Sequence, residues 1–194
     1  ATTNRGKLSE FSSLLSDCSF ALVSLSDLGI DVDVEETGSS LEENATLKAS
    51  TYAHMSGLVT LADDSGLEVE ALGGEPGPLS SRYAGPDADD AQRIAHLLQK
   101  LNNVSEEDRH ARFRCVIAIA SPGGRVDLYD GECRGVIARE PSGGGGFGYD
   151  PVFYLPELGK TMADLSPDEK NRVSHRGSAA RKAAAALKRR VMEA

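Results

Sequence analysis

The sequence predicts a mixed α/β fold, with helices packed on a central sheet. Segments with helical periodicity, such as 89–101, interleave along the chain with apolar runs of strand length, such as 115–120. A Pro-Gly-Gly turn joins the strand-like segments 111–120 and 126–139, which predicts at least one antiparallel pair in the sheet. With 194 residues, 40% of them hydrophobic, the chain is long enough to bury one sizeable core, so we expect a single domain over 1–194.

Local patterns predict the individual elements. Two capping boxes, Ser40–Glu43 and Ser166–Glu169, each begin a helix. Strict alternation of apolar and polar residues predicts strands, and clustered Gly and Pro predict loops. In chain order we expect a helix after residue 7, a strand over 30–36, a helix over 41–55, strands over 58–62 and 67–70, a loop over 73–78, the helix over 89–101, the two hairpin strands, a loop over 142–151, a short helix after 166 and an Ala-rich helix over about 178–193. Residues 1–4 have the pattern of the end of a further strand.

Composition narrows the function classes. The net charge of −9 disfavours binding to nucleic acid or to an anionic membrane, although residues 170–194 carry eight Lys and Arg against one Glu. No apolar run approaches the roughly 18 residues of a membrane span, and no signal peptide is visible. Three dispersed cysteines without a CxxC pair are typical of a reduced protein, so we expect a cytoplasmic location. The four histidines lack zinc-ligand spacing.

An acidic pair, Asp63–Asp64, follows the apolar segment 58–62 and precedes a Ser-Gly pair. Because side chains alternate along a strand, Asp63 shares a face with Leu61, and Asp64 emerges on the less bulky face of Ala62. A carboxylate at the end of a rigid strand suits a hard cation such as Mg²⁺. The alternative is that the two acids only cap a turn with the Ser-Gly pair.

Other polar residues have both a functional and an ordinary interpretation. The turn over 2–7 leads into a helix and could bind phosphate through free N–H groups and Lys7, although a plain helix cap would look the same. Glu35 belongs to a row of outward-facing acids that could equally be a solvated strand face. On helical pattern alone, Lys48 is expected to face solvent.

The segment 142–151 contains four consecutive glycines followed by Phe147. Its glycines match the spacing GxGxxG, but Pro151 and a strand-like run follow where a dinucleotide site requires a helix, so that reading is rejected. A ring between glycines could stack on a base, and a flexible hairpin loop is the alternative. Lys170, His175 and Arg176 offer hydrogen-bond donors for a base carbonyl or a phosphate. The alternative is that they only stabilise a helix C-terminus by a favourable interaction with the helix dipole.

Six motifs occur in a fixed order along almost the whole chain: 1–7 (ATTNRGK), 41–49 (LEENATLKA), 62–67 (ADDSGL), 81–85 (SRYAG), 145–151 (GGFGYDP) and 169–176 (EKN through SHR). In these motifs the chain resembles the inosine triphosphate pyrophosphatases, also called dITP/XTP pyrophosphatases or the Ham1-like family. One departure is Thr3, at a position where the family usually has Gly.

The resemblance implies a homodimeric α/β protein with a long mixed sheet and a cleft between two lobes. It implies Mg²⁺-dependent hydrolysis of ITP, dITP and XTP, which are non-standard purine nucleoside triphosphates, to the monophosphate and pyrophosphate. It also implies a role for each matched residue. Thr2, Thr3, Asn4, Arg5, Gly6 and Lys7 would hold the triphosphate; Glu35 and Asp64 would bind the metal, with Asp64 also the general base; Lys48 and Ser65 would contact phosphate; and Phe147, Gly148, Tyr149, Asp150, Lys170, His175 and Arg176 would form the nucleoside pocket.

Two other functions fit the same residues. A Maf-like pyrophosphatase would act on other nucleotides. A nucleotide-binding module without turnover would use the same acids and lysines to bind and not to hydrolyse.

Overall fold

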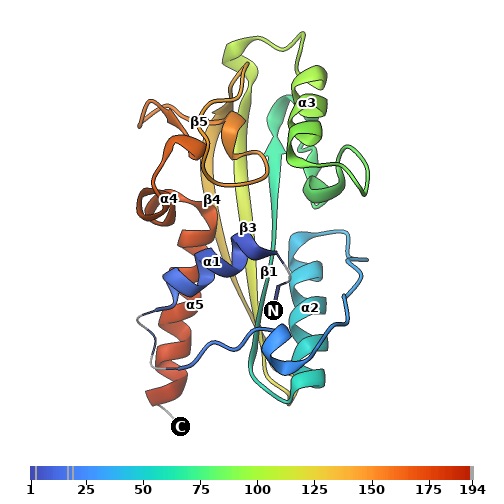
Figure 1. The fold of residues 1–194 in the computed structure, drawn as a ribbon, viewed down its shortest axis with the longest axis vertical. Helices are drawn as coiled ribbons and strands as arrows, with labels where there is room; N and C mark the ends of the chain where they lie inside the picture. The colour runs from blue at the N-terminus through green and yellow to red at the C-terminus, as the bar shows by residue number, and fades with distance from the viewer. Residues whose placement is uncertain (3, 17, 19, 193–194) are drawn as a thin grey trace. The chain divides into compact units, whose positions relative to one another are not determined.

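A six-stranded sheet in the order β2-β1-β3-β4-β5-β6 forms the centre of the fold (Figure 1). The computed structural model describes residues 1–2, 4–16, 18 and 20–192. The strands are β1 (Thr60–Val69), β2 (Pro76–Gly77), β3 (His110–Ala120), β4 (Val126–Ile137), β5 (Phe153–Leu155) and β6 (Lys160–Thr161). The pairs β1–β2, β4–β5 and β5–β6 are antiparallel, with Leu67 opposite Gly77 and Val136 opposite Tyr154. The sheet is therefore antiparallel where a mixed sheet was expected.

The helices are α1 (Arg5–Leu14), α2 (Leu41–Ser56), α3 (Asp90–Lys100), α4 (Pro167–Val173) and α5 (His175–Met192). Asn4, Ser40, Asp89 and Ser166 cap the first four, because each side chain accepts a hydrogen bond from the third residue of its helix. The capping box predicted at Ser166 is complete. At Ser40 only half of the predicted box forms, since the Glu43 carboxylate binds Ser39 instead. The last helix begins at His175, three residues earlier than expected.

The chain divides into two compact units. The first consists of the described residues of 1–64, 115–131 and 175–194. In it, α1 and α5 cover one face of β3 and α2 covers the other (Figure 1). Alternate residues of β3 point to the two sides, with Cys115 and Ile117 packed toward α1 and α5, and Val116 and Ala118 toward α2. This explains why the segment 115–120 is apolar throughout.

The second unit consists of residues 65–114 and 132–174. Its single core packs α3 and the segment 149–165 against the sheet. Ile94 and Leu97 supply the buried stripe of α3, as predicted from their helical spacing. The rings of Phe113 and Phe153 lie 4.4 Å apart at the centre of this core.

Two elements differ from the sequence-based expectation. The segments 58–62 and 67–70 are not two strands separated by a turn, because β1 runs unbroken through the acidic pair and Gly66. A Cβ on Gly66 would lie 2.2 Å from the Gly77 carbonyl oxygen, so this glycine permits close approach of β2 and does not form a turn. The segment 30–36 joins no strand ladder in the part of the chain that the structure describes, and Val32 is 53% exposed. Without a backbone partner, alternation alone does not make a strand.

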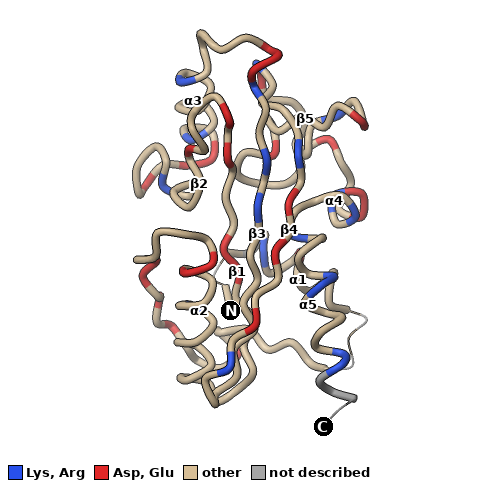
Figure 2. Tube along the Cα trace, turned by 180° about the vertical axis from the view of Figure 1, so that it is seen from behind, with Lys and Arg blue, Asp and Glu red and all other residues tan. Residues whose placement is uncertain are grey.

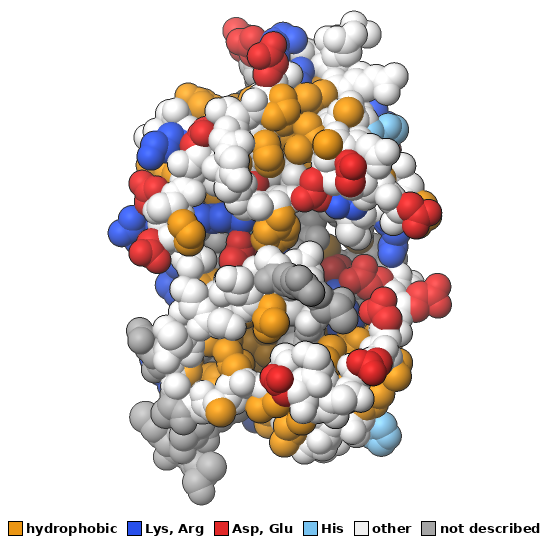
Figure 3. Space-filling view, in the orientation of Figure 1, with side chains coloured by type: hydrophobic (Ala, Val, Ile, Leu, Met, Phe, Trp, Pro, Cys, Tyr) orange, Lys and Arg blue, Asp and Glu red, His pale blue; other side chains and the backbone are white. Residues whose placement is uncertain are grey.

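Charges are dispersed over the molecule. Acidic residues lie along the segment before α2, whereas α5 carries Lys and Arg (Figure 2). The face shown in Figure 3 intersperses acidic, basic and hydrophobic side chains, and no single basic patch covers it. Among the described residues, no helix is both long and apolar enough to cross a membrane.

Candidate active site

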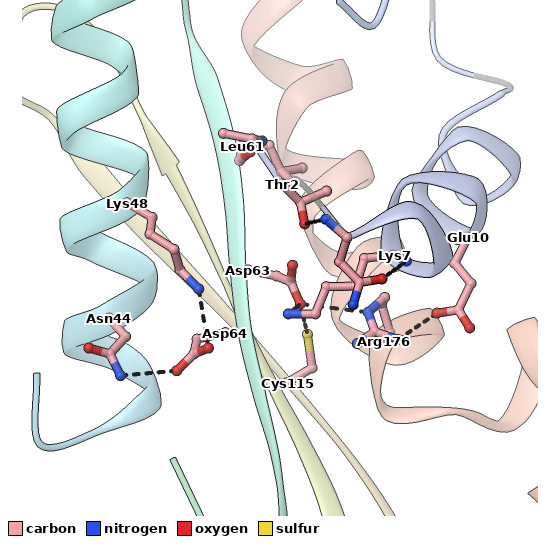
Figure 4. A network of polar contacts seen from close by, with 12 residues as sticks. Thr2, Lys7, Glu10, Asn44, Lys48, Leu61, Asp63, Asp64, Cys115 and Arg176 are labelled. Atoms are coloured by element: carbon pink, nitrogen blue, oxygen red, sulfur yellow. Dashed lines mark hydrogen bonds and ion pairs between the residues drawn. The ribbon is translucent and has the colours of Figure 1, made fainter. Parts of the chain in front are cut away.

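The neighbouring carboxylates of Asp63 and Asp64 leave β1 on opposite sides (Figure 4). Asp64 lies on the side of α2, and Asp63 lies on the side of α1 and α5. Both residues are buried, at 2% exposed for Asp63 and 5% for Asp64. The alternation predicted for the strand is therefore present, but it separates two buried environments and not a buried face from an open one.

On the α2 side, Asp64 contacts two side chains from one face of the helix. The Asn44 Nδ2 donates to one carboxylate oxygen at 3.2 Å, and the Lys48 Nζ donates to the other at 3.2 Å (Figure 4). Residues four apart lie above one another on a helix, so a single orientation of α2 delivers both groups. The expectation from helical pattern that Lys48 faces solvent is wrong, since its side chain is 13% exposed.

Lys48 also contacts a second carboxylate, because its Nζ lies 2.6 Å from Glu36 Oε1. The two acids therefore meet at a single ammonium group. Burial raises the pKa of Asp64 and the negative charge of Glu36 raises it further, while Lys48 lowers it; the net shift is upward. Burial lowers the pKa of Lys48, but Asp64, Asp63 and Glu36 together raise it above its ordinary value.

The structure brings Glu36 to this cluster and not Glu35. Glu35 is exposed, and Glu36 is half-buried beside Lys48. The outward row of acids in which Glu35 was placed requires a strand, and residues 30–36 do not form one in the described structure. Glu35 as a metal ligand, which the resemblance implies, stays a prediction.

On the other side of β1, Asp63 lies between two cations. The Lys7 Nζ is 2.9 Å from its carboxylate and the Arg176 Nε is 3.6 Å away (Figure 4). Arg176 is 2% exposed and forms a second ion pair, of 2.5 Å, with Glu10. The Cys115 thiol, 3.9 Å away, donates to the same Asp63 carboxylate.

These charges set the protonation states of the cluster. Burial alone would raise the pKa of Asp63, but Lys7, Arg176 and Lys48 hold it well below its ordinary range. Burial opposes the charge of Arg176, yet Asp63 and Glu10 hold its pKa above its ordinary value. Burial and the Asp63 charge raise the pKa of Cys115 to about 12, so this thiol stays neutral.

The predicted phosphate loop lies at the N-terminus of α1. The Asn4 side chain accepts the Lys7 N–H at 3.0 Å, and the Thr2 hydroxyl accepts the Asn4 N–H at 3.2 Å. Gly6 and Lys7 are half-buried in the first turn of the helix. Thr3 lies outside the described residues, and Arg5 is described only as the first residue of the helix.

In the second unit, the glycine-rich loop is held by carboxylates. Asp150 accepts the Phe147 N–H at 2.9 Å and the Lys170 Nζ at 2.6 Å. The same ammonium lies 4.6 Å from the centre of the Phe147 ring, a cation–π contact. The Tyr149 hydroxyl donates to the Ser80 carbonyl at 2.9 Å. Phe147, Asp150 and Lys170, predicted as pocket residues, therefore lie together.

The model of the Ham1 family matches residues 1–186. The chain belongs to the Ham1 family. It is 49% identical over 189 residues to a dITP/XTP pyrophosphatase of Desulforamulus reducens, covering 97% of this chain and 94% of that protein. It is 52% identical over 179 residues to a dITP/XTP pyrophosphatase of Geobacillus kaustophilus, covering 92% and 88%.

Solved Ham1 structures have the same fold. A HAM1 protein from Coxiella burnetii superposes with a TM-score of 0.89 at 44% identity, covering 97% of this chain and 96% of that one. The Ham1 protein of Staphylococcus aureus superposes with a TM-score of 0.86 at 45% identity, covering 96% and 95%. The α/β fold expected from the resemblance is thereby confirmed.

Within this Ham1 chain, the remaining predicted residues lie in three places. Ser65 follows Asp64 in β1 and is half-buried. His175 and Arg176 form the first turn of α5 and are buried in the first unit, at 4% and 2% exposed. Gly148 lies in the loop of the second unit and donates its N–H to Asp90. Direct contact of His175 and Arg176 with a nucleoside stays a prediction.

Sequence reasoning missed four residues of these clusters: Asn44, Glu36, Glu10 and Asp90. One signal could have found Asn44, because it precedes Lys48 by one helical turn beside the buried stripe of Leu41 and Ala45. The other three act through tertiary contacts with distant segments, and no local spacing announces them.

Proposed function

We propose that this chain hydrolyses dITP and XTP, and by the same chemistry ITP, to the nucleoside monophosphate and pyrophosphate. The names of the two bacterial relatives, both dITP/XTP pyrophosphatases, support this substrate class. The observation that carries the proposal is the buried Asp64 carboxylate, held by Asn44 and Lys48. Such a group can accept a proton while a cation lies beside it to offset phosphate charge.

The residues on the α2 side of β1 fit a magnesium ion. Asp64 and Glu36 present oxygen ligands around one point, where both contact the Lys48 ammonium. Among the described residues there is no group of three or more His, Cys, Asp or Glu side chains arranged for a metal. A site with one or two carboxylates, completed by water and substrate phosphates, is the one that Mg²⁺ prefers. When bound, Mg²⁺ would neutralise phosphate oxygens and polarise the phosphorus.

The reaction assigns one task to each of the central residues. Asp64 accepts the proton of the attacking water, which its carboxylate can reach from its place beside Lys48. The water oxygen bonds to the α-phosphorus, and the bond from that phosphorus to the bridging oxygen breaks. Pyrophosphate leaves with the electron pair, and the charges of Lys48 and Lys7 offset the charge it gains.

We assign the nucleoside to the loop of the second unit. The Phe147 ring is half-buried and offers a stacking surface, and Lys170 beside it is a donor that suits the 6-carbonyl of hypoxanthine or xanthine. Lys170 already donates one N–H to Asp150 and has further ammonium protons, whereas adenine carries a donor amine at the same position and cannot accept from them. The N–H groups of Phe147 and Gly148 already donate to carboxylates, so these two amides are not the ones that read the base.

The decisive experiment measures the products formed from dITP, XTP, dATP and a modified pyrimidine triphosphate in the presence of Mg²⁺. We expect dIMP and pyrophosphate in equal amounts from dITP, and a much lower kcat/KM for dATP. Preference for the pyrimidine nucleotide would indicate a Maf-like activity. Tight binding of dITP without product would indicate a non-catalytic nucleotide-binding module.

We further propose that the protein is a homodimer. The resemblance is the ground for this, and sedimentation of the purified chain at micromolar concentration tests it. A species of about twice the 20.5 kDa chain mass is the expected result.

A further inference from the structure

The loop that carries Phe147 depends on contacts from outside itself for its conformation. Gly143, Gly146 and Gly148 all adopt left-handed φ angles, of 83°, 72° and 61°. Glycine visits this region and the ordinary region about equally, so the sequence of the loop does not fix its path. The contacts that hold the Phe147 ring in place must therefore come from side-chain and tertiary anchors.

Two anchors are part of the predicted motif. Asp150 accepts the Phe147 N–H, and a Cβ on Gly146 would lie 2.1 Å from the Asp150 carboxylate, so the loop is wrapped tightly around this residue. Tyr149 is held by its own buried hydroxyl, which donates to the Ser80 carbonyl. Neither of these anchors holds Gly148.

The third anchor is Asp90, which precedes Gly148 by 58 positions. Its Oδ2 accepts the Gly148 N–H at 2.7 Å. Its other oxygen contacts the Arg93 guanidinium, which also donates to the Ser81 and Ala88 carbonyls at 2.7 Å and 2.6 Å. The carboxylate is thus oriented from its own helix and aimed at the loop.

Favourable interaction with the α3 dipole explains an acid in the first turn but does not explain this orientation. The neighbouring Asp89 already serves the helix, since it caps α3 in a complete capping box with Gln92. Asp89 and Asp90 therefore have different tasks: one begins the helix, and the other reaches from it to the loop.

We propose that Asp90 is a positioning residue for nucleobase recognition, which holds Gly148 and thereby the adjacent Phe147 ring in the conformation that accepts the base. This inference rests on the proposed function, because it concerns the same substrate. Asp90 itself touches neither the base nor the phosphates in this assignment.

Three variants test the proposal: Asp90→Ala, Asp90→Asn and Asp89→Ala. In Asp90→Ala we expect KM for dITP to rise roughly tenfold with kcat within about twofold of wild type, as for loss of one hydrogen bond to a charged group. Asp90→Asn keeps one acceptor oxygen, which can serve the Gly148 N–H or Arg93 but not both, so its KM should lie between those of wild type and Asp90→Ala. Asp89→Ala removes the helix cap, so it should lower Tm while leaving KM unchanged.

A readout independent of turnover accompanies the kinetics. Hydrogen exchange of the Gly148 amide should accelerate at least tenfold in Asp90→Ala, by a smaller factor in Asp90→Asn, and remain slow in Asp89→Ala. Unchanged exchange and unchanged KM in Asp90→Ala would overturn the inference, as would equal effects of Asp89→Ala and Asp90→Ala. A wild-type protein that does not hydrolyse dITP would overturn the proposed function instead, whatever the exchange of Gly148 shows.

Discussion

Asp63 and Asp64 are adjacent in β1, yet one lies 2.9 Å from Lys7 and the other 3.2 Å from Lys48. The strand thereby separates two lysines and gives each its own carboxylate. Their pKa values shift in opposite directions: the pKa of Asp64 is raised and the pKa of Asp63 is lowered. Two neighbouring acids with diverging pKa values are typical of a division of labour, in which one group accepts protons and the other stays ionised.

The two glutamates before α2 can be told apart by metal affinity. Glu36→Gln removes the carboxylate that shares Lys48 with Asp64, so the Mg²⁺ concentration for half-maximal rate should rise roughly tenfold or more. Glu35→Gln, one residue away and exposed, is the matched control and should change it little. Binding of Mn²⁺ measured by calorimetry provides the readout without turnover. An effect confined to Glu35→Gln would show that Glu35, the metal ligand that the resemblance implies, binds the metal and that Glu36 does not.

Removal of the Asp63 charge should destabilise the fold. Asp63→Asn leaves Lys7 and the fully buried Arg176 without their shared anion, so we expect a loss of about 3–5 kcal/mol in the free energy of unfolding at pH 7. Urea denaturation measures it. A loss within about 0.5 kcal/mol would show that the cluster is not a structural unit.

The same variant has a defined pH dependence. Because the pKa of Asp63 is depressed on folding, its contribution is present above the unfolded value of 3.8 and is lost as pH falls toward the folded one. The stability difference between wild type and Asp63→Asn should therefore be constant from pH 8 to about 5 and shrink below about 4. A difference that shrinks already between pH 7 and 5 would contradict this assignment.

Phe147 should contribute to base affinity through its ring. Phe147→Leu removes the aromatic surface above Lys170 and should raise KM for dITP roughly tenfold, in line with the strength of stacking between a base and an aromatic side chain. Phe147→Tyr keeps the ring and is the control, with an expected KM within about threefold of wild type. Equal KM values for the leucine variant and wild type would exclude stacking on this ring.

Much of the fold follows from local pattern. The helices α2 and α3 and the hairpin of β3 and β4 are predicted nearly to their ends, because capping residues, periodicity and a Gly-rich turn act within a few residues. The strand predicted over 30–36 is wrong, since a strand also needs a neighbouring strand and this segment pairs with none among the described residues. The Ser-Gly pair after Asp64 was expected to end the strand, whereas β1 continues through it and Gly66 lets β2 approach.

The site is less predictable than the fold. Helical pattern assigned Lys48 to solvent, because periodicity registers apolar residues and not a lysine that a buried acid holds. Alternation did separate Asp63 from Asp64, but it gave no sign that Lys7 and Arg176 flank Asp63 or that Glu10 pairs with Arg176. Charge clusters that combine distant segments depend on tertiary structure, and short-range pattern does not contain them.

The most direct test compares pyrophosphate release from dITP by wild type and by Asp64→Asn at saturating Mg²⁺. Asparagine keeps the shape of the side chain and one acceptor oxygen, for Asn44 or Lys48, but cannot take up a proton or offer a charged ligand. The account predicts Mg²⁺-dependent release of one pyrophosphate per dIMP by wild type, and a kcat lower by roughly 3 orders of magnitude in the variant. A variant within tenfold of wild type, or orthophosphate as the first product of the wild type, would contradict it.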